Sequence, residues 1–203
     1  MLQLATITSP FFKSLSELGE FEEVAADELP APYQTLLAHD DHMTVTVEAY
    51  HGSLVNVRVL QERRDGDVYT RASLLTRQSD GAVVQFGIMR INLVGLSDVV
   101  RREIEQRGMP LGRILIRHNV MRHVRLFKLW RIRPGPVVLE HLLTSVRGVA
   151  VGGVSDAEDA IHRATKSASE TPPTKEKQCI YGRSAGIVVE GRPSVELLEI
   201  VKA

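Results

Sequence analysis

The clearest pattern in the sequence is an alternation of apolar and polar residues in three consecutive segments. These segments span residues 54–62, 68–77 and 82–92. A two-residue period is that of a β-strand with one buried face, and the Asp-Gly pairs between the segments favour tight turns. The pattern therefore predicts an antiparallel meander. Two further strands, 179–190 and 194–202, are joined by a Gly-Arg-Pro turn and predict a hairpin.

A helical period follows the meander. Ser97 can cap a helix in which Val100 and Ile104 share one face. Gly108 fits the position just past the C-terminus of this helix. Pro110 then stands where a second helix begins, because a proline at that position loses no hydrogen bond.

The remaining segments are less periodic. A short helix is expected after Pro32. Residues 43–48 fit a strand, because they are β-branched and alternate, or a helix, because caps precede them and Gly52 follows. Residues 1–30 predict a packing arm. Residues 134–177 contain a Gly-rich stretch and a polar, Pro-containing end, and we interpret them as an insertion.

Together these elements predict an α+β protein, a single domain with an antiparallel β-sheet and flanking helices. A chain of 203 residues is long enough for one sizeable core. Lys and Arg together number 25, as do Asp and Glu, so the net charge does not point to nucleic acid or an anionic membrane. The lone Cys179 and the lack of a long apolar run lead us to expect a cytoplasmic protein without membrane insertion.

One segment departs from this charge balance. Residues 113–133 contain seven Lys or Arg residues and no Asp or Glu, interleaved with Phe127 and Trp130. Such interleaving is typical of a nucleic-acid surface. A strand with one wet face gives the same pattern, and so does a cleft for a ligand with several carboxylates. Because the chain is neutral overall, we expect no nucleic-acid partner.

Arg71 is the first candidate for ligand binding. It shares a strand face with Tyr69, Ser73 and Leu75, which are apolar or weakly polar. A guanidinium in such surroundings can clamp a carboxylate through two parallel hydrogen bonds. The alternative is an ordinary strand arginine whose stem packs and whose head reaches water.

Glu199 is a second candidate. It shares an otherwise apolar strand face with Leu197, whereas Glu196 points to the opposite face. A carboxylate on an apolar face is either exposed at a sheet edge or buried there for a functional role. Periodicity does not choose between the two glutamates, because both faces are largely apolar.

Two other stretches could bind ions. The free N–H groups of Leu111 and Gly112, at the start of the second helix, favour an anion; the alternative is a plain corner between helices. The His-Asp-Asp-His sequence at 39–42 contains metal-ligand types, but no third ligand is identifiable elsewhere. We therefore expect no metal, and interpret Asp40 or Asp41 as a helix cap.

Five short motifs occur in the order seen in the chorismate pyruvate-lyase family, which the sequence resembles over most of residues 30–133 and 179–203. They are Met43 after a capped turn, Tyr69-Thr70-Arg71, Pro110-Leu111-Gly112-Arg113, Tyr181-Gly182-Arg183-Ser184, and Gly191-Arg192-Pro193 followed by Glu199. The resemblance implies a compact α+β domain with helical flaps over an enclosed ligand site. It also implies conversion of chorismate to 4-hydroxybenzoate and pyruvate, in aromatic and ubiquinone biosynthesis, without metal or organic cofactor.

The resemblance also implies site residues. Arg71 and Glu199 match the family's ligand-site arginine and glutamate. Met43 and Leu111 match its other two ligand-contacting positions. Chorismate carries two carboxylates, so Arg71 and the N–H groups near Leu111 could each hold one. We expect Glu199, its acid form favoured by apolar neighbours, to assist proton transfer to the departing enolpyruvate.

Two alternatives stay open. The same fold resembles the effector-binding domain of some bacterial transcription regulators, in which a pocket senses a small molecule without catalysis. The first thirty residues show no convincing DNA-binding helix-turn-helix, which disfavours that interpretation. The other alternative is a lyase that forms a different hydroxybenzoate isomer.

Overall fold

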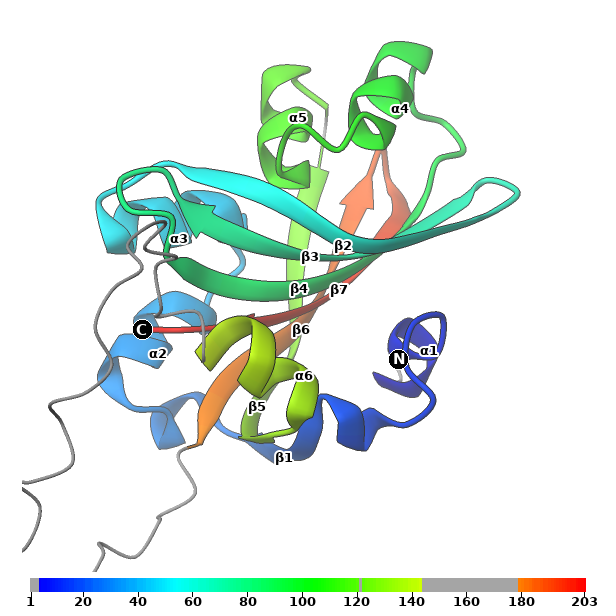
Figure 1. The fold of residues 1–203 in the computed structure, drawn as a ribbon. Helices are drawn as coiled ribbons and strands as arrows, with labels where there is room; N and C mark the ends of the chain where they lie inside the picture. Colours follow the sequence, from blue (N-terminus) through cyan, green and yellow to red (C-terminus); the bar gives the residue numbers. More distant parts are fainter. Residues whose placement is uncertain (1–3, 121, 144–178) are drawn as a thin grey trace, which may run out of the picture.

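The computed structural model describes residues 4–120, 122–143 and 179–203. These residues form one α+β domain, a seven-stranded antiparallel sheet with helices on both faces, as the sequence predicts (Figure 1). The strands are β1 (Gly19–Val24), β2 (Val55–Asp65), β3 (Val68–Arg77), β4 (Val83–Asn92), β5 (Arg122–Pro134), β6 (Ile180–Val189) and β7 (Arg192–Val201). The helices are α1 (Leu4–Thr8), α2 (Ala31–Leu37), α3 (Met43–His51), α4 (Asp98–Glu105), α5 (Leu111–Arg117) and α6 (Pro136–Val138). Short turns of other helix types are η1 (Leu15–Glu17), η2 (Ala26–Glu28) and η3 (Leu139–Leu143).

Both predicted strand groups are confirmed. Strands β2, β3 and β4 form the meander, and the turns after β2 and β3 contain Gly66 and Gly81 with positive φ. Strands β6 and β7 form the hairpin, which turns at Glu190 and Gly191. In space the strand order is β1-β5-β6-β7-β4-β3-β2. The hairpin therefore lies in the middle of the sheet and joins the meander to the other two strands.

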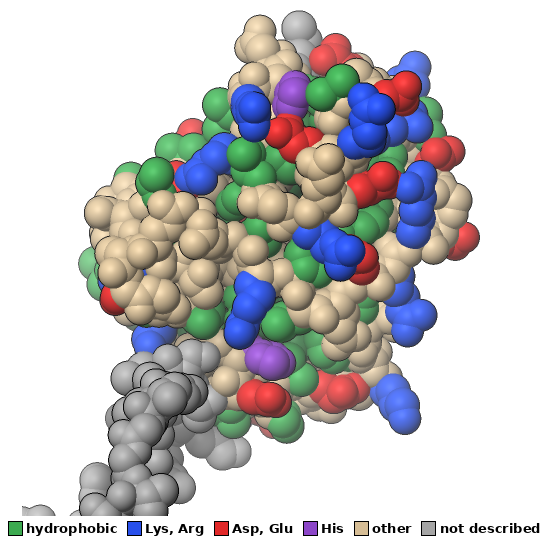
Figure 2. Space-filling model, turned by 45° about the horizontal axis from the view of Figure 1, so that its top comes forward, with side chains coloured by type: hydrophobic (Ala, Val, Ile, Leu, Met, Phe, Trp, Pro, Cys, Tyr) green, Lys and Arg blue, Asp and Glu red, His purple; other side chains and the backbone are tan. Residues whose placement is uncertain are grey.

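The N-terminal arm contributes an edge strand that the sequence analysis did not identify. Strand β1 pairs with the basic strand β5 and places its acidic residues beside the basic ones. The ion pairs are Lys128 with Glu23, Arg131 with Glu22 at 3.5 Å, and Arg133 with Glu20 at 3.2 Å. Much of the charge of β5 is thus balanced within the sheet. On the face drawn in Figure 2, basic and acidic side chains are interspersed rather than gathered in one basic patch.

The ambiguous segment 43–48 belongs to helix α3. Its side chains Met43, Thr44 and Val47 are buried on one face, and Gly52 ends the helix with φ of +59°. Tertiary packing thus outweighs the strand propensity of the β-branched residues. Neither Asp40 nor Asp41 caps this helix, because residue 42 occupies the N-cap position.

The two helices after the meander form as predicted, and they lie together at one end of the sheet (Figure 1). Ser97 caps α4 by accepting a hydrogen bond from the Val100 N–H at 3.4 Å. The expected role of Gly108 is wrong, because Arg107, with φ of +62°, is the left-handed residue after this helix. None of the helices in the described residues is long and apolar enough to span a membrane.

The segment interpreted as an insertion is described only in part. Pro134 ends strand β5, and the chain then forms α6 and η3, whose Val138 and Leu142 are buried. Residues 144–177 lie outside the described residues.

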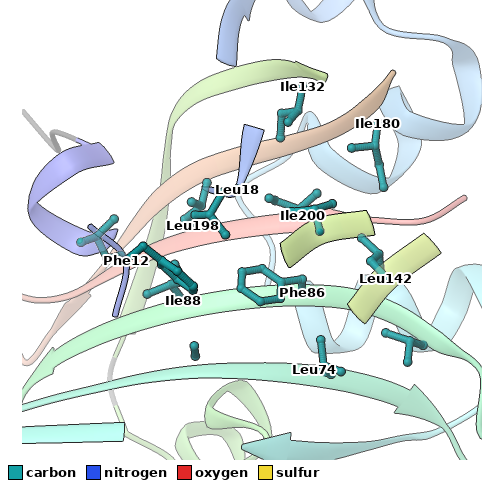
Figure 3. Close-up of a cluster of buried hydrophobic side chains, with 14 residues drawn as sticks. Phe12, Leu18, Leu74, Phe86, Ile88, Ile132, Leu142, Ile180, Leu198 and Ile200 are labelled. Atoms are coloured by element: carbon teal, nitrogen blue, oxygen red, sulfur yellow. The ribbon is translucent and has the colours of Figure 1, made fainter. Parts of the chain in front are cut away.

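One face of the central strands forms an apolar core. It packs against α1, α6 and η3 (Figure 3). Its members include Phe12, Leu74, Phe86, Ile88, Leu142, Leu198 and Ile200. Burying each such side chain contributes roughly 1.5–3 kcal/mol. This core fixes the sheet, and the opposite face of the same strands carries both polar and apolar side chains.

Candidate functional site

Three rows of side chains cross the opposite face of the central strands. Strand pairing places Ser73, Gly87, Glu199 and Arg183 in the middle row. The row on one side contains Arg71, Met89 and Leu197, and the row on the other contains Leu75, Gln85 and Val201. Residues two apart on a strand share a face, so all three rows point to the same side of the sheet. Because the middle row has a glycine at its centre, space remains between Ser73 and Glu199.

A cavity lies between these rows and the starts of α3 and α5. The space inside it that a water-sized sphere can occupy is about 60 Å³, and the total is about 580 Å³ when the solvent at its open mouth is included. The cavity lining includes all residues predicted for the site: Met43, Arg71, Leu111, Gly112 and Glu199. The structure thus brings together side chains that are far apart in the sequence.

Gly112 closes the roof of the cavity. A Cβ atom at this position would lie 3.1 Å from Thr44 Oγ1 and 3.4 Å from His42 Nδ1. The missing side chain therefore lets α5 approach the start of α3 closely. Binding of an anion by the N–H groups of Leu111 and Gly112 stays a prediction.

Arg71 is a buried cation that makes no ion pair among the described residues, although the charge of Glu62 on the paired strand acts on it. Its exposed fraction is 2%, and its Nε has no hydrogen-bond partner among the described residues. One terminal nitrogen makes a long hydrogen bond of 3.5 Å to the carbonyl of Ile104. Burial lowers the pKa of the guanidinium, and the neighbouring Tyr69 opposes this shift. An arginine remains protonated even so, so the cavity favours a negatively charged ligand.

Tyr69 links this arginine to the edge of the sheet. Its hydroxyl donates a hydrogen bond of 2.7 Å to Glu62 Oε2. Burial, followed by this hydrogen bond, raises the pKa of Tyr69 to about 12. The phenol therefore stays neutral, and Glu62 is held on β2 instead of pairing directly with Arg71.

Glu199 is buried in an ion pair. Its Oε2 accepts a hydrogen bond of 2.8 Å from Nε of Arg183, and the two residues are 6% and 0% exposed. The other guanidinium nitrogens of Arg183 donate to the carbonyls of His39 at 2.8 Å and Asp41 at 3.1 Å. Arg183 thus ties Glu199 to the loop between α2 and α3.

This pairing corrects the expected surroundings of Glu199. Its neighbours are not only apolar, because the guanidinium of Arg183 lies directly beside the carboxylate. Glu196, the other candidate, lies on the opposite face and pairs with Arg90 at 3.0 Å, where both side chains are partly exposed. The structure therefore separates a buried glutamate at the cavity from a surface one.

The His-Asp-Asp-His stretch holds the loop above the cavity in place. Asp40 Oδ1 accepts a hydrogen bond of 2.7 Å from the Leu126 N–H. His42 Nε2 accepts one of 2.6 Å from Nε of Arg122. No group of three His, Cys, Asp or Glu side chains within the described part of the chain is arranged to hold a metal ion.

The pH dependence of stability should carry a contribution from His42. Burial, and then the positive charge of Arg122, lowers the pKa of His42 from 6.5 to about 4. Because folding favours the neutral ring, this contribution is complete above pH 6.5 and is lost as the pH falls towards 4. The variant His42→Gln should therefore show a smaller loss of melting temperature between pH 7 and pH 4, followed by circular dichroism. The exposed His123→Gln serves as the control, and an unchanged pH profile for His42→Gln would contradict the assignment.

The sequence matches no family model and no curated protein. The functional interpretation therefore rests on the geometry and chemistry of the cavity.

Proposed function

We propose that the cavity binds chorismate and that the protein is a chorismate pyruvate-lyase forming 4-hydroxybenzoate and pyruvate. The observation that carries this proposal is Arg71, a buried guanidinium that lines the cavity and makes no ion pair among the described residues. A ligand carboxylate would compensate its charge through charge-assisted hydrogen bonds. The carboxyl group of Glu199, which also lines the cavity, supplies a candidate for proton transfer.

Beyond binding the substrate, the reaction requires only a group that transfers one proton. The reaction breaks the ring C3–O bond to the enolpyruvyl group and the ring C4–H bond. The ring becomes aromatic, which drives the elimination, and the departing enolpyruvate gains a proton on carbon to become pyruvate. A base that accepts the ring proton and returns it to enolpyruvate balances the reaction.

Two residues of this cavity fit the required roles. Arg71 would hold the ring carboxylate and so orient the substrate. Glu199, held in place by its hydrogen bond from Arg183, would accept the ring proton and deliver it to the departing group. Apolar lining residues such as Leu75, Met89 and Leu197 exclude water and strengthen these polar contacts.

The direct test is to incubate the purified protein with chorismate, without added metal or cofactor. Pyruvate is followed by a coupled assay and the aromatic product by chromatography. Formation of both at equal rates is the expected result, and the isomer recovered identifies the product. Intact chorismate together with a raised melting temperature would instead indicate a binding module. The absence of both turnover and thermal stabilisation would contradict the proposal.

Removing the cation should weaken product binding. The variant Arg71→Ala is expected to bind 4-hydroxybenzoate roughly tenfold to a hundredfold more weakly, because a charge-assisted hydrogen bond to the carboxylate is lost. Isothermal titration calorimetry measures the Kd. The control is Arg58→Ala, which removes an exposed arginine from strand β2. An unchanged Kd for Arg71→Ala would exclude the clamp role.

A further inference from the structure

Gln85 is a second polar residue of the cavity with a buried atom that has no partner among the described residues. It lies on strand β4 and is 6% exposed, and its Oε1 makes no hydrogen bond among the described residues. Three buried side-chain polar atoms of the described residues have no partner: His51 Nε2, Arg71 Nε and Gln85 Oε1. Two of the three residues line the same cavity. Because buried polar groups are normally paired, these two atoms are the natural contacts for a ligand of the cavity.

The amide of Gln85 leans over the cavity floor. Its Nε2 lies 3.2 Å from the position that a Cβ atom on Gly87 would take. Gly87 is paired directly with Glu199, so Gln85 and Glu199 are diagonal neighbours, a spacing that long side chains can bridge. The glutamine therefore borders the same part of the cavity as the glutamate.

Gln85 and Arg71 lie at opposite ends of the cavity floor. Strand pairing sets Gln85 across from Leu75, four residues along β3 from Arg71. That register separates their Cα atoms by roughly 14 Å. A ligand that pairs with both side chains therefore needs polar groups at its two opposite ends.

We propose that Gln85 sets the specificity of the cavity for carboxylic acids that carry a ring hydroxyl opposite the carboxylate. The inference rests on the proposed function, in which Arg71 holds the ring carboxylate. Chorismate and 4-hydroxybenzoate both carry a hydroxyl in that position. A hydroxyl both donates and accepts hydrogen bonds, so it pairs with the amide whichever end of the amide faces the ligand.

This arrangement also distinguishes hydroxybenzoate isomers. A hydroxyl next to the carboxylate, as in 2-hydroxybenzoate, stays at the Arg71 end of the cavity. The amide of Gln85 then remains buried and unpaired, which disfavours that ligand. Gln85 thus selects the 4-hydroxy isomer.

The test compares ligands that differ only in this hydroxyl. The protein should bind 4-hydroxybenzoate roughly tenfold to a hundredfold more tightly than benzoate or 2-hydroxybenzoate by calorimetry. In Gln85→Met, a variant of similar length without the amide, this preference should fall by about tenfold through weaker binding of 4-hydroxybenzoate alone. Gln61→Met, on an exposed position of β2, is the matched control.

The outcomes separate the specificity role from the proposed function. A preference that survives in Gln85→Met would overturn the role of Gln85 and leave the proposed function intact. No binding of any of the three acids to the unaltered protein would overturn the proposed function, and this inference with it. The ligand-free variant should melt at the same or a higher temperature, because an unpaired amide has been removed. A clear drop in melting temperature would show that the amide is satisfied within the protein and would also overturn the inference.

Discussion

Glu199→Gln is expected to bind 4-hydroxybenzoate normally and to turn over chorismate roughly 10²–10⁴-fold more slowly. The amide oxygen can still accept the hydrogen bond from Arg183, so the shape of the cavity is kept. It cannot take up the ring proton, so the chemical step loses its base. The measurements are kcat from pyruvate release and Kd from calorimetry.

The same strand offers the control for this variant. Glu196→Gln removes an equal charge from strand β7, on the opposite face and in a partly exposed pair. It should leave both kcat and Kd unchanged. Undiminished turnover in Glu199→Gln would remove this residue from the mechanism.

Arg183→Met is expected to lower the free energy of unfolding by about 3–5 kcal/mol. The substitution leaves Glu199 charged, buried and unpaired. It also removes the donors to the backbone carbonyls of His39 and Asp41. Unfolding in urea, followed by circular dichroism, measures the change.

Two further variants identify the cause of this loss. Arg90→Met breaks the partly exposed pair with Glu196 and should cost only about 0–1 kcal/mol. The double variant Arg183→Met, Glu199→Leu removes both buried charges and should regain a large part of the stability. A loss below about 1 kcal/mol for Arg183→Met would show that the buried pair is not needed for folding.

Elements with a strong local signal could be predicted from the sequence. The meander and the hairpin were recognisable because alternation and turn residues agree over each whole segment. The cap at Ser97 and the shared face of Arg71, Ser73 and Leu75 follow from local spacing alone. These features are set by residues only a few positions apart.

Elements that depend on distant partners could not be predicted with the same success. In the sequence, strand β1 is only a run of acidic residues. Its strand conformation depends on pairing with the basic strand β5, which is distant in the sequence. Helix α3 carries four β-branched residues directly after Met43, and only burial against the rest of the fold decides its conformation. In both cases local preference is weak or misleading, and tertiary contacts determine the outcome.

The main chemical groups of the candidate site could be predicted from the sequence, but the residues with which they pair could not. Arg71 and Glu199 were identified, but Arg183 was noted only as part of a motif. A regular hairpin with its turn at Gly191 would not place Arg183 opposite Glu199. The pairing register shifts by one residue near Ile187, and this shift brings the two residues together. Gln85 had no signal at all, because its significance lies in a hydrogen bond that it does not make within the protein.

The central position of the β6–β7 hairpin has a consequence for protein synthesis. When a ribosome has made the chain as far as Leu143, the meander and strand β5 exist, but the strands that join them do not. Their inner edges then remain open to wrong partners, a situation that favours slow folding and association of nascent chains. Arg183 and Glu199 arrive on the hairpin that completes the sheet. The candidate site is therefore complete only when this hairpin is in place, and a premature stop codon before Ile180 would yield a chain without either residue.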